Sequence, residues 1–240
     1  MMKRLIVICL AVLALSSCST EKQSVTVVAH DSFAISDELI TEFEKDSGYK
    51  LKVVRAGDVG AMTSKLVLTK DSPIADIVYG IDNTFSPVAI NNKIIDGELT
   101  AIDYADVCFN VDLSYFKENN LDIPSHWKDL IQPKYKSLTV ISNPNTSSPG
   151  LAFLAATYAY LNNPQDIPEP VSWWLALRDN GVKVAASWED AYYTDFSGST
   201  GRGKYPIVLS YSSSPAYEVD EQGKPKTQAL LKDCSDKPNT

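Results

Sequence analysis

The sequence of 240 residues has few of the side chains on which catalysis and metal binding most often depend. It contains two histidines and four cysteines, and no cysteines stand at the spacing of a zinc site. No serine lies in the G-x-S-x-G arrangement that exposes a nucleophile, and only His30 and His126 remain as catalytic bases of the usual kind. We therefore expect a protein that is not an enzyme and that uses neither metal nor cofactor.

Positive charge is also scarce, with 22 Lys and Arg against 30 Asp and Glu and a net charge of −8. Loss of residues 1–17 would remove two basic residues, Lys3 and Arg4, and no acidic ones, so the net charge would become −10. Nucleic acids require a basic face, so the balance argues against such a partner. It suits a cationic or neutral ligand.

The most apolar run near the N-terminus, Leu5–Leu15, is too short to span a bilayer and follows two basic residues, as in a secretion signal. It ends in "LSSC", which resembles the cleavage box of bacterial lipoproteins, in which the cysteine is lipidated. We expect a signal peptide over 1–17 and a tether over 18–24 lipidated at Cys18, which would anchor the protein on the extracytoplasmic face of the cell membrane. An ordinary secretion signal cut nearby and a short membrane helix are the alternatives.

Cys9 would leave with the signal peptide and Cys18 would carry the lipid, which leaves Cys108 and Cys234 as the two thiols of the mature chain. Outside the membrane they could pair, but sequence spacing alone does not show that their Cα atoms come within disulfide range. We expect both to be unpaired.

Apolar strands alternate with amphipathic helices in the first part of the chain. The expected strands are 25–29, 50–56 and 75–80, and the expected helices are a segment that ends at Gly48 and the segment 58–70. This alternation predicts an α/β fold with a parallel sheet covered on both faces.

Polar residues follow each of these three strands, where an open parallel sheet binds its ligands. They are His30, Asp31 and Ser32 after the first strand, Gly57 and Asp58 after the second, and Asp82 and Asn83 after the third. Polar residues after a single strand would indicate only a turn. Polar residues after three strands at the same edge of the sheet, here called the rim, predict a binding site. Asp82 has an alternative role as the cap of the next helix.

A second α/β unit is expected from the rest of the chain. After a strand pair or crossover at 99–116, the sequence predicts a strand within 123–144 and a helix with Ser148 at its N-cap and Pro149 at its first position. Further expected elements are a helix over 171–181, a strand over 182–187, a helix over 188–196 and a strand over 206–212.

Several segments together resemble the thiamine-binding lipoproteins of bacterial ABC importers, which belong to the two-lobed periplasmic binding proteins. They include "HDSFA", "ADIVYGIDNT", "NTSSPGLAFL", "SWEDAYYTDF" and "VLSYSSSPAYEV". The resemblance implies two α/β lobes with mixed, mostly parallel sheets that close on thiamine or a thiamine phosphate. It also implies a monomer that delivers this ligand to an ABC permease and its ATPase.

The resemblance places lobe 1 over 25–103 and lobe 2 over 104–214. Family members then return to the first lobe, so 215–240 is expected to be the truncated start of a return segment. Lobe 1 is accordingly expected to be incomplete.

The resemblance also suggests which residues line the cleft. They are His30, where the family has an aromatic ring, and Asp31, Ser32, Asp82, Asn83, Trp188 and Tyr211. Thiamine combines a cationic thiazolium with a flat aminopyrimidine, which suits carboxylates and aromatic faces. A phosphorylated form would need an anion site, for which we expect Ser147 and Ser148 at the start of a helix.

Other interpretations remain open. Trp188 could be a core aromatic, and the adjacent Tyr192 and Tyr193 are typical of ferric-iron-binding proteins of the same fold. The short ending also allows an inactive truncated remnant that does not take part in transport.

Overall fold

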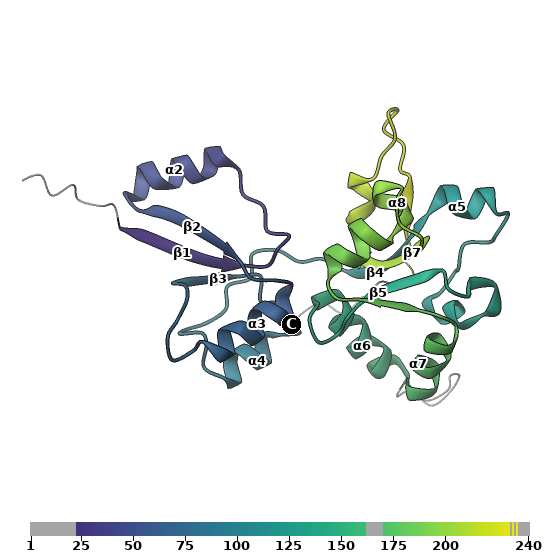
Figure 1. The fold of residues 1–240 in the computed structure, drawn as a ribbon, viewed down its shortest axis with the longest axis horizontal. Coiled ribbons are helices and arrows are strands. Elements are labelled where there is room, and N and C mark those ends of the chain that lie inside the picture. Colours follow the sequence, from purple (N-terminus) through teal and green to yellow (C-terminus); the bar gives the residue numbers. More distant parts are fainter. Residues whose placement is uncertain (1–22, 162–169, 231, 233, 235–240) are drawn as a thin grey trace, which may run out of the picture.

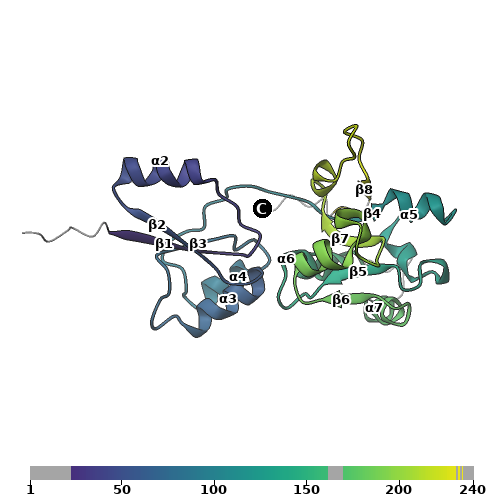
Figure 2. The ribbon, with the colours of Figure 1, turned by 45° about the horizontal axis from the view of Figure 1, so that its top comes forward.

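The computed structural model describes residues 23–161, 170–230, 232 and 234, which form two lobes side by side, each built on its own sheet (Figure 1). A second view shows the same two lobes and the chain that crosses between them (Figure 2). The expected signal peptide, and Cys18 with it, lies outside the described residues. Within the described ranges, no helix has the length and apolar character needed to cross a bilayer.

Lobe 1 carries a sheet with the order β2-β1-β3, in which both neighbours of β1 run parallel to it. Its elements are β1 (Ser24–Ala29), α2 (Asp37–Ser47), β2 (Lys50–Arg55), α3 (Val59–Leu68), β3 (Ile77–Tyr79) and α4 (Ser86–Asn91). Ser36 Oγ accepts a hydrogen bond from the Leu39 N–H at the start of α2, and Gly48 ends this helix with a φ of 77°. The predicted alternation of strands and helices is confirmed.

The helices of lobe 1 lie on both sides of its sheet, with α2 on one side and α3 and α4 on the other (Figures 1 and 2). Their cover is thin. No residue of α2 is buried, and Leu39 of this helix is 56% exposed. Ile77 of β3 is 52% exposed, whereas Met62 and Thr63 of α3 are buried. Lobe 1 therefore keeps apolar surface in contact with solvent.

Lobe 2 carries a mixed sheet with the order β6-β5-β7-β4-β8. Strand β5 runs parallel to β6 and β7, whereas β4 is antiparallel to β7 and β8. The strands of lobe 2 are β4 (Val107–Asp112), β5 (Thr139–Ser142), β6 (Lys183–Ala185), β7 (Ile207–Tyr211) and β8 (Thr227–Ala229). Its helices are α5 (Leu113–Glu118), η1 (Trp127–Ile131), η2 (Pro133–Tyr135), α6 (Ser148–Leu161), α7 (Pro170–Asp179), the π-helix η3 (Asp190–Asp195), α8 (Ser197–Thr200) and η4 (Ser214–Tyr217).

The main core of the molecule lies in lobe 2. Phe109 of β4 and Leu209 of β7 share one face of the sheet and belong to a buried cluster with Trp173 and Leu177 of α7. The expected α/β architecture is thus present in both lobes, with a parallel sheet in lobe 1 and a mixed sheet in lobe 2.

Strand β8 was not predicted. Thr227–Ala229 pairs with Asn110–Asp112 at the edge of the sheet of lobe 2. These residues fall in the segment expected to start a return toward lobe 1, and in the structure they extend lobe 2.

Helix α6 starts one residue earlier than predicted. The Leu151 N–H donates to the Ser147 carbonyl oxygen at 3.0 Å, which makes Ser147 the N-cap. The prediction of Ser148 as N-cap is wrong, since Ser148 is the first helical residue and Pro149 the second.

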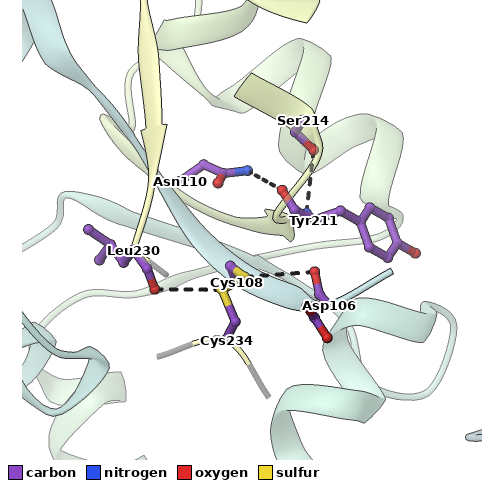
Figure 3. The surroundings of a disulfide bond; sticks show 7 residues. All are labelled: Asp106, Cys108, Asn110, Tyr211, Ser214, Leu230 and Cys234. Atoms are coloured by element: carbon purple, nitrogen blue, oxygen red, sulfur yellow. Dashed lines mark hydrogen bonds between the residues drawn. A yellow bond between two sulfur atoms is a disulfide. The ribbon is translucent and has the colours of Figure 1, made fainter. Parts of the chain in front are cut away.

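The expectation that Cys108 and Cys234 are unpaired is also wrong, because the two form a disulfide (Figure 3). Their Cα atoms lie 4.5 Å apart, although 126 positions separate them in the sequence. Strand β8 brings the chain beside β4, and the Leu230 N–H donates to the Phe109 carbonyl oxygen at 2.8 Å. This pairing carries Cys234 to the start of β4, a proximity that sequence spacing does not reveal.

Candidate functional site

A cleft of about 1820 Å³ runs between the two lobes and along lobe 1. We call it the interlobe cleft. Both lobes line it: its wall includes His30, Asp58 and Asp82 from lobe 1 and Ser148, Trp188 and Tyr211 from lobe 2. Ser32 and Asn83 also line it, whereas Asp31 and Ser147 do not. The structure thus gathers seven of the nine candidate residues around one space, and ligand contact remains a prediction for all nine.

His30 follows β1 and lies against Gly80, which follows β3. A Cβ atom on residue 80 would come within 2.4 Å of His30 Cδ2, so only glycine permits this approach. Burial lowers the pKa of His30, although the negative charges of Asp58, Asp31, Glu189 and Asp103 act in the opposite direction. The imidazole is therefore neutral at pH 7 and offers a flat face to the cleft.

Asp31 links two strand ends. Its Oδ1 accepts a hydrogen bond from the Gly57 N–H at 2.8 Å, and its own N–H donates to the Gly57 carbonyl oxygen at 3.1 Å. Ser32 is exposed beside it. The carboxylate of Asp31 thus helps hold the rim together.

Asp82 caps the turn that leads into α4. Its Oδ1 accepts from the N–H groups of Thr84 and Phe85 at 3.0 and 3.1 Å and from the Thr84 hydroxyl at 2.7 Å. The N-cap of α4 itself is Phe85, which makes no side-chain capping bond, so Asp82 caps the turn before the helix and not the helix. Because Asp82 also lines the cleft, its charge contributes to the potential there.

Trp188 of lobe 2 is half-buried at the cleft wall, just before η3. Its Nε1–H donates to Ser210 Oγ at 2.8 Å, which fixes the indole. The ring stacks on Tyr192 with centroids 5.1 Å apart and an angle of 16°, and it lies 6.0 Å from the Tyr211 ring. Trp188 thus packs on one side against lobe 2 and still lines the cleft.

Carboxylates dominate the charge of the cleft. Burial raises the pKa of Tyr211, and the charges of Asp58, Asp82 and Asp103 raise it further. Tyr211 is therefore a neutral phenol within the field of these three acidic side chains. A cation in the cleft would be attracted by these charges and by the faces of the aromatic rings.

The N-terminus of α6 meets the cleft at Ser148. The hydroxyls of Ser147 and Ser148 are buried, and neither has a hydrogen-bond partner among the described residues. Free hydroxyls beside the N-terminus of a 14-residue helix suit an anion.

The tyrosine pair is the basis of the iron-binding alternative, which stays a prediction, and neither Tyr192 nor Tyr193 lines the interlobe cleft. The rings of Tyr192 and Tyr193 meet edge to face, and burial, with the charge of Glu218, raises the pKa of Tyr192. Ferric iron binds phenolate, which a raised pKa disfavours. No group of three or more His, Cys, Asp and Glu residues suited to a metal occurs in the described part of the chain.

Sequence reasoning placed Asp58 on the rim but did not include it among the candidates, and it missed Tyr79, Phe33 and Asp103, which also line the cleft. Phe33 packs against Tyr79 with ring centroids 4.8 Å apart. The Tyr79 hydroxyl donates to Asp103 Oδ2 at 3.4 Å, which links β3 to the crossover segment. The alternation of side chains along β3 could have indicated that Tyr79 faces the cleft, but nothing in the sequence indicated Asp103.

Known proteins of similar sequence are periplasmic binding proteins. The chain is 28% identical over 225 residues to the thiamine-binding periplasmic protein of Salmonella typhimurium and 26% identical over 239 residues to that of Brucella suis. The alignments cover 85% and 92% of this chain and 64% and 68% of those proteins. The chain therefore spans about two thirds of the length of these relatives.

Solved structures show the same fold. A periplasmic thiamin binding protein superposes with a TM-score of 0.72 at 24% identity, over 88% of this chain and 69% of that one. Iron-bound HitA from Pseudomonas aeruginosa superposes with a TM-score of 0.59 at 17% identity, over 86% and 69%. At such identities the superpositions establish the fold and not the ligand.

A family model described as bacterial extracellular solute-binding protein matches residues 72–224, which is more than half of the sequence. This match agrees with the two lobes, with the cleft between them and with the expectation of a binding protein. The chain belongs to the bacterial extracellular solute-binding proteins, a family of non-enzymatic binding proteins.

Proposed function

We propose that this protein binds thiamine or a thiamine phosphate in the interlobe cleft and delivers it to an ABC permease and its ATPase. The observation that carries the proposal is the convergence of carboxylates with the aromatic faces of Trp188 and Tyr211 in one cleft. A thiazolium ring is cationic and flat, so it gains from both. The relatives described above carry the name thiamine-binding periplasmic protein, which supports this ligand over other cations.

The phosphorylated forms are supported by the start of α6. The dipole of this helix and the hydroxyls of Ser147 and Ser148, which have no partner among the described residues, favour an anion where Ser148 lines the cleft. A thiamine phosphate would place its cation near the aromatic rings and its phosphate near this helix. We therefore expect the monophosphate to bind at least as tightly as thiamine.

Isothermal titration calorimetry tests the proposal. Thiamine, its monophosphate and its diphosphate are titrated into the protein, with the free aminopyrimidine half of thiamine as the matched ligand control. We expect thiamine to bind and the neutral half, which lacks the cation, to bind at least tenfold more weakly. No heat with any thiamine compound at millimolar concentration would rule out this ligand, and a visible absorption band on addition of ferric iron would favour the iron-binding alternative.

We propose in addition that Cys18 carries a lipid that anchors the protein to the membrane. Cys18→Ser should release the protein into the soluble fraction, and Cys9→Ser, a matched change inside the apolar run, should leave it anchored. Release of neither variant would show that the segment Leu5–Leu15 is itself the anchor.

A further inference from the structure

The two lobes are joined by hydrogen bonds at the start of α3. Asp58 precedes this helix, and its Oδ1 accepts from the Val59 N–H at 2.8 Å, as an N-cap does. Its Oδ2 accepts from the backbone N–H of Trp188 in lobe 2, also at 2.8 Å. A single carboxylate thus holds the start of a helix in lobe 1 and reaches across to lobe 2.

A second bond crosses between the lobes two residues later. The Gly60 N–H donates to the Thr146 carbonyl oxygen at 2.9 Å. A Cβ atom on residue 60 would lie 2.6 Å from the Asn145 carbonyl oxygen, so the close approach of the two backbones requires glycine. In both views α3 lies on the side of lobe 1 that faces lobe 2 (Figures 1 and 2).

The loops that make these contacts are braced within each lobe. In lobe 2 the Thr146 hydroxyl donates to the Ala186 carbonyl oxygen at 2.6 Å, which ties the loop before α6 to the loop before Trp188. In lobe 1 the loop before Asp58 is fastened through Gly57 to Asp31. Each lobe therefore presents its half of the contact as one unit.

We propose that the hydrogen bonds from Trp188 to Asp58 and from Gly60 to Thr146 form an interlobe latch that holds the lobes together before ligand binds. The groups involved are backbone atoms and one carboxylate, so no ligand atom is needed to form it. Less of the ligand's binding free energy is then needed to close the lobes, and its apparent affinity is therefore higher. The latch also fixes Trp188 at the cleft wall, and it does not depend on which solute the protein carries.

Amide hydrogen exchange of the ligand-free protein tests the latch. In Asp58→Asn one acceptor oxygen is replaced by an NH₂ group, and we expect the Trp188 and Gly60 amides each to exchange at least tenfold faster than in the unaltered protein. The Met62 amide, which donates to the Asp58 carbonyl oxygen within α3, reports whether the helix itself has frayed. Asp129→Asn is the matched control, because Asp129 accepts from the Ser125 and His126 N–H groups inside lobe 2.

The latch predicts that Asp58→Asn also increases the radius of gyration in small-angle X-ray scattering and that Asp129→Asn does not. Faster exchange at Trp188 alone, or at neither amide, would overturn the proposal. If Met62 also loses protection, Thr146→Val decides instead, since it removes the hydroxyl that braces the loop of lobe 2 and leaves Asp58 and the residues of α3 unaltered. Unchanged exchange at Gly60 and Trp188 in Thr146→Val would then exclude the latch.

Discussion

The imidazole of His30 rests against Gly80 so closely that a methyl group on residue 80 would come within 2.4 Å of His30 Cδ2. Gly80 also has a φ of 97°, in the region that glycine adopts most readily. The two residues directly follow β1 and β3, so this contact sets where the imidazole lies on the cleft wall.

Replacing Gly80 with alanine should therefore displace His30 and weaken ligand binding by at least tenfold, or about 1.4 kcal/mol. Gly97→Ala is the matched control, because Gly97 has a φ of 102° and nothing would lie within 4 Å of its Cβ. It should lose about 1–2 kcal/mol of stability from backbone strain alone, with affinity unchanged. Calorimetry measures the thiamine affinity of both variants, and thermal melts measure their stability. If Gly80→Ala and Gly97→Ala bind thiamine equally well, the position of His30 does not contribute to ligand binding.

The stacking of Trp188 predicts a graded loss of affinity. Trp188→Ala should weaken thiamine binding by roughly 1–2 kcal/mol because it removes the aromatic face. Trp188→Phe keeps a ring but loses the hydrogen bond to Ser210, so we expect an intermediate affinity. Tyr160→Ala serves as the control, since Tyr160 is an exposed aromatic of lobe 2 outside the cleft wall. If Trp188→Ala binds thiamine as tightly as the unaltered protein, the indole has only a packing role.

Sequence patterns predicted the features that depend on neighbouring residues. The strands of lobe 1, the end of α2 at Gly48 and the polar strand ends on one rim all follow from local periodicity and from the rule for parallel sheets. Features that join distant segments were missed. The Cys108–Cys234 disulfide and the Asp58–Trp188 bond span 126 and 130 positions, and only the folded chain brings those partners together.

The sequence also did not predict strand β8. This strand has only three residues, and its sequence shows no apolar pattern. It is a strand because its backbone pairs with that of β4. For Asp82 the sequence allowed two roles, a capping residue and a ligand contact, and could not distinguish between them. In the structure its carboxylate accepts hydrogen bonds within the turn before α4 and also lines the cleft.

The disulfide should stabilise lobe 2 because it closes a long loop and so restricts the unfolded chain. Cys108→Ala combined with Cys234→Ala should lower the free energy of unfolding by about 2–4 kcal/mol. Melts of the Cys18→Ser protein with and without reductant measure the effect, and the double variant should be insensitive to reductant. Two free thiols in the folded, unreduced mature Cys18→Ser protein would contradict the disulfide.

The lowered pKa of His30 predicts that acid destabilises the protein. The unfolded chain takes up the proton near the ordinary pKa of 6.5, whereas the folded protein does so only at lower pH. The unfolded state therefore binds more protons in this interval, and the free energy of unfolding falls as the pH drops from 6.5 through the folded pKa. A protonated His30 would also repel a cationic ligand, so thiamine affinity should fall over the same interval. Denaturant unfolding and calorimetry between pH 5 and 8, with His30→Gln as the non-titrating control, measure both effects. His30→Gln should show a flatter dependence on pH, and identical profiles for the two proteins would assign the acid sensitivity to other groups.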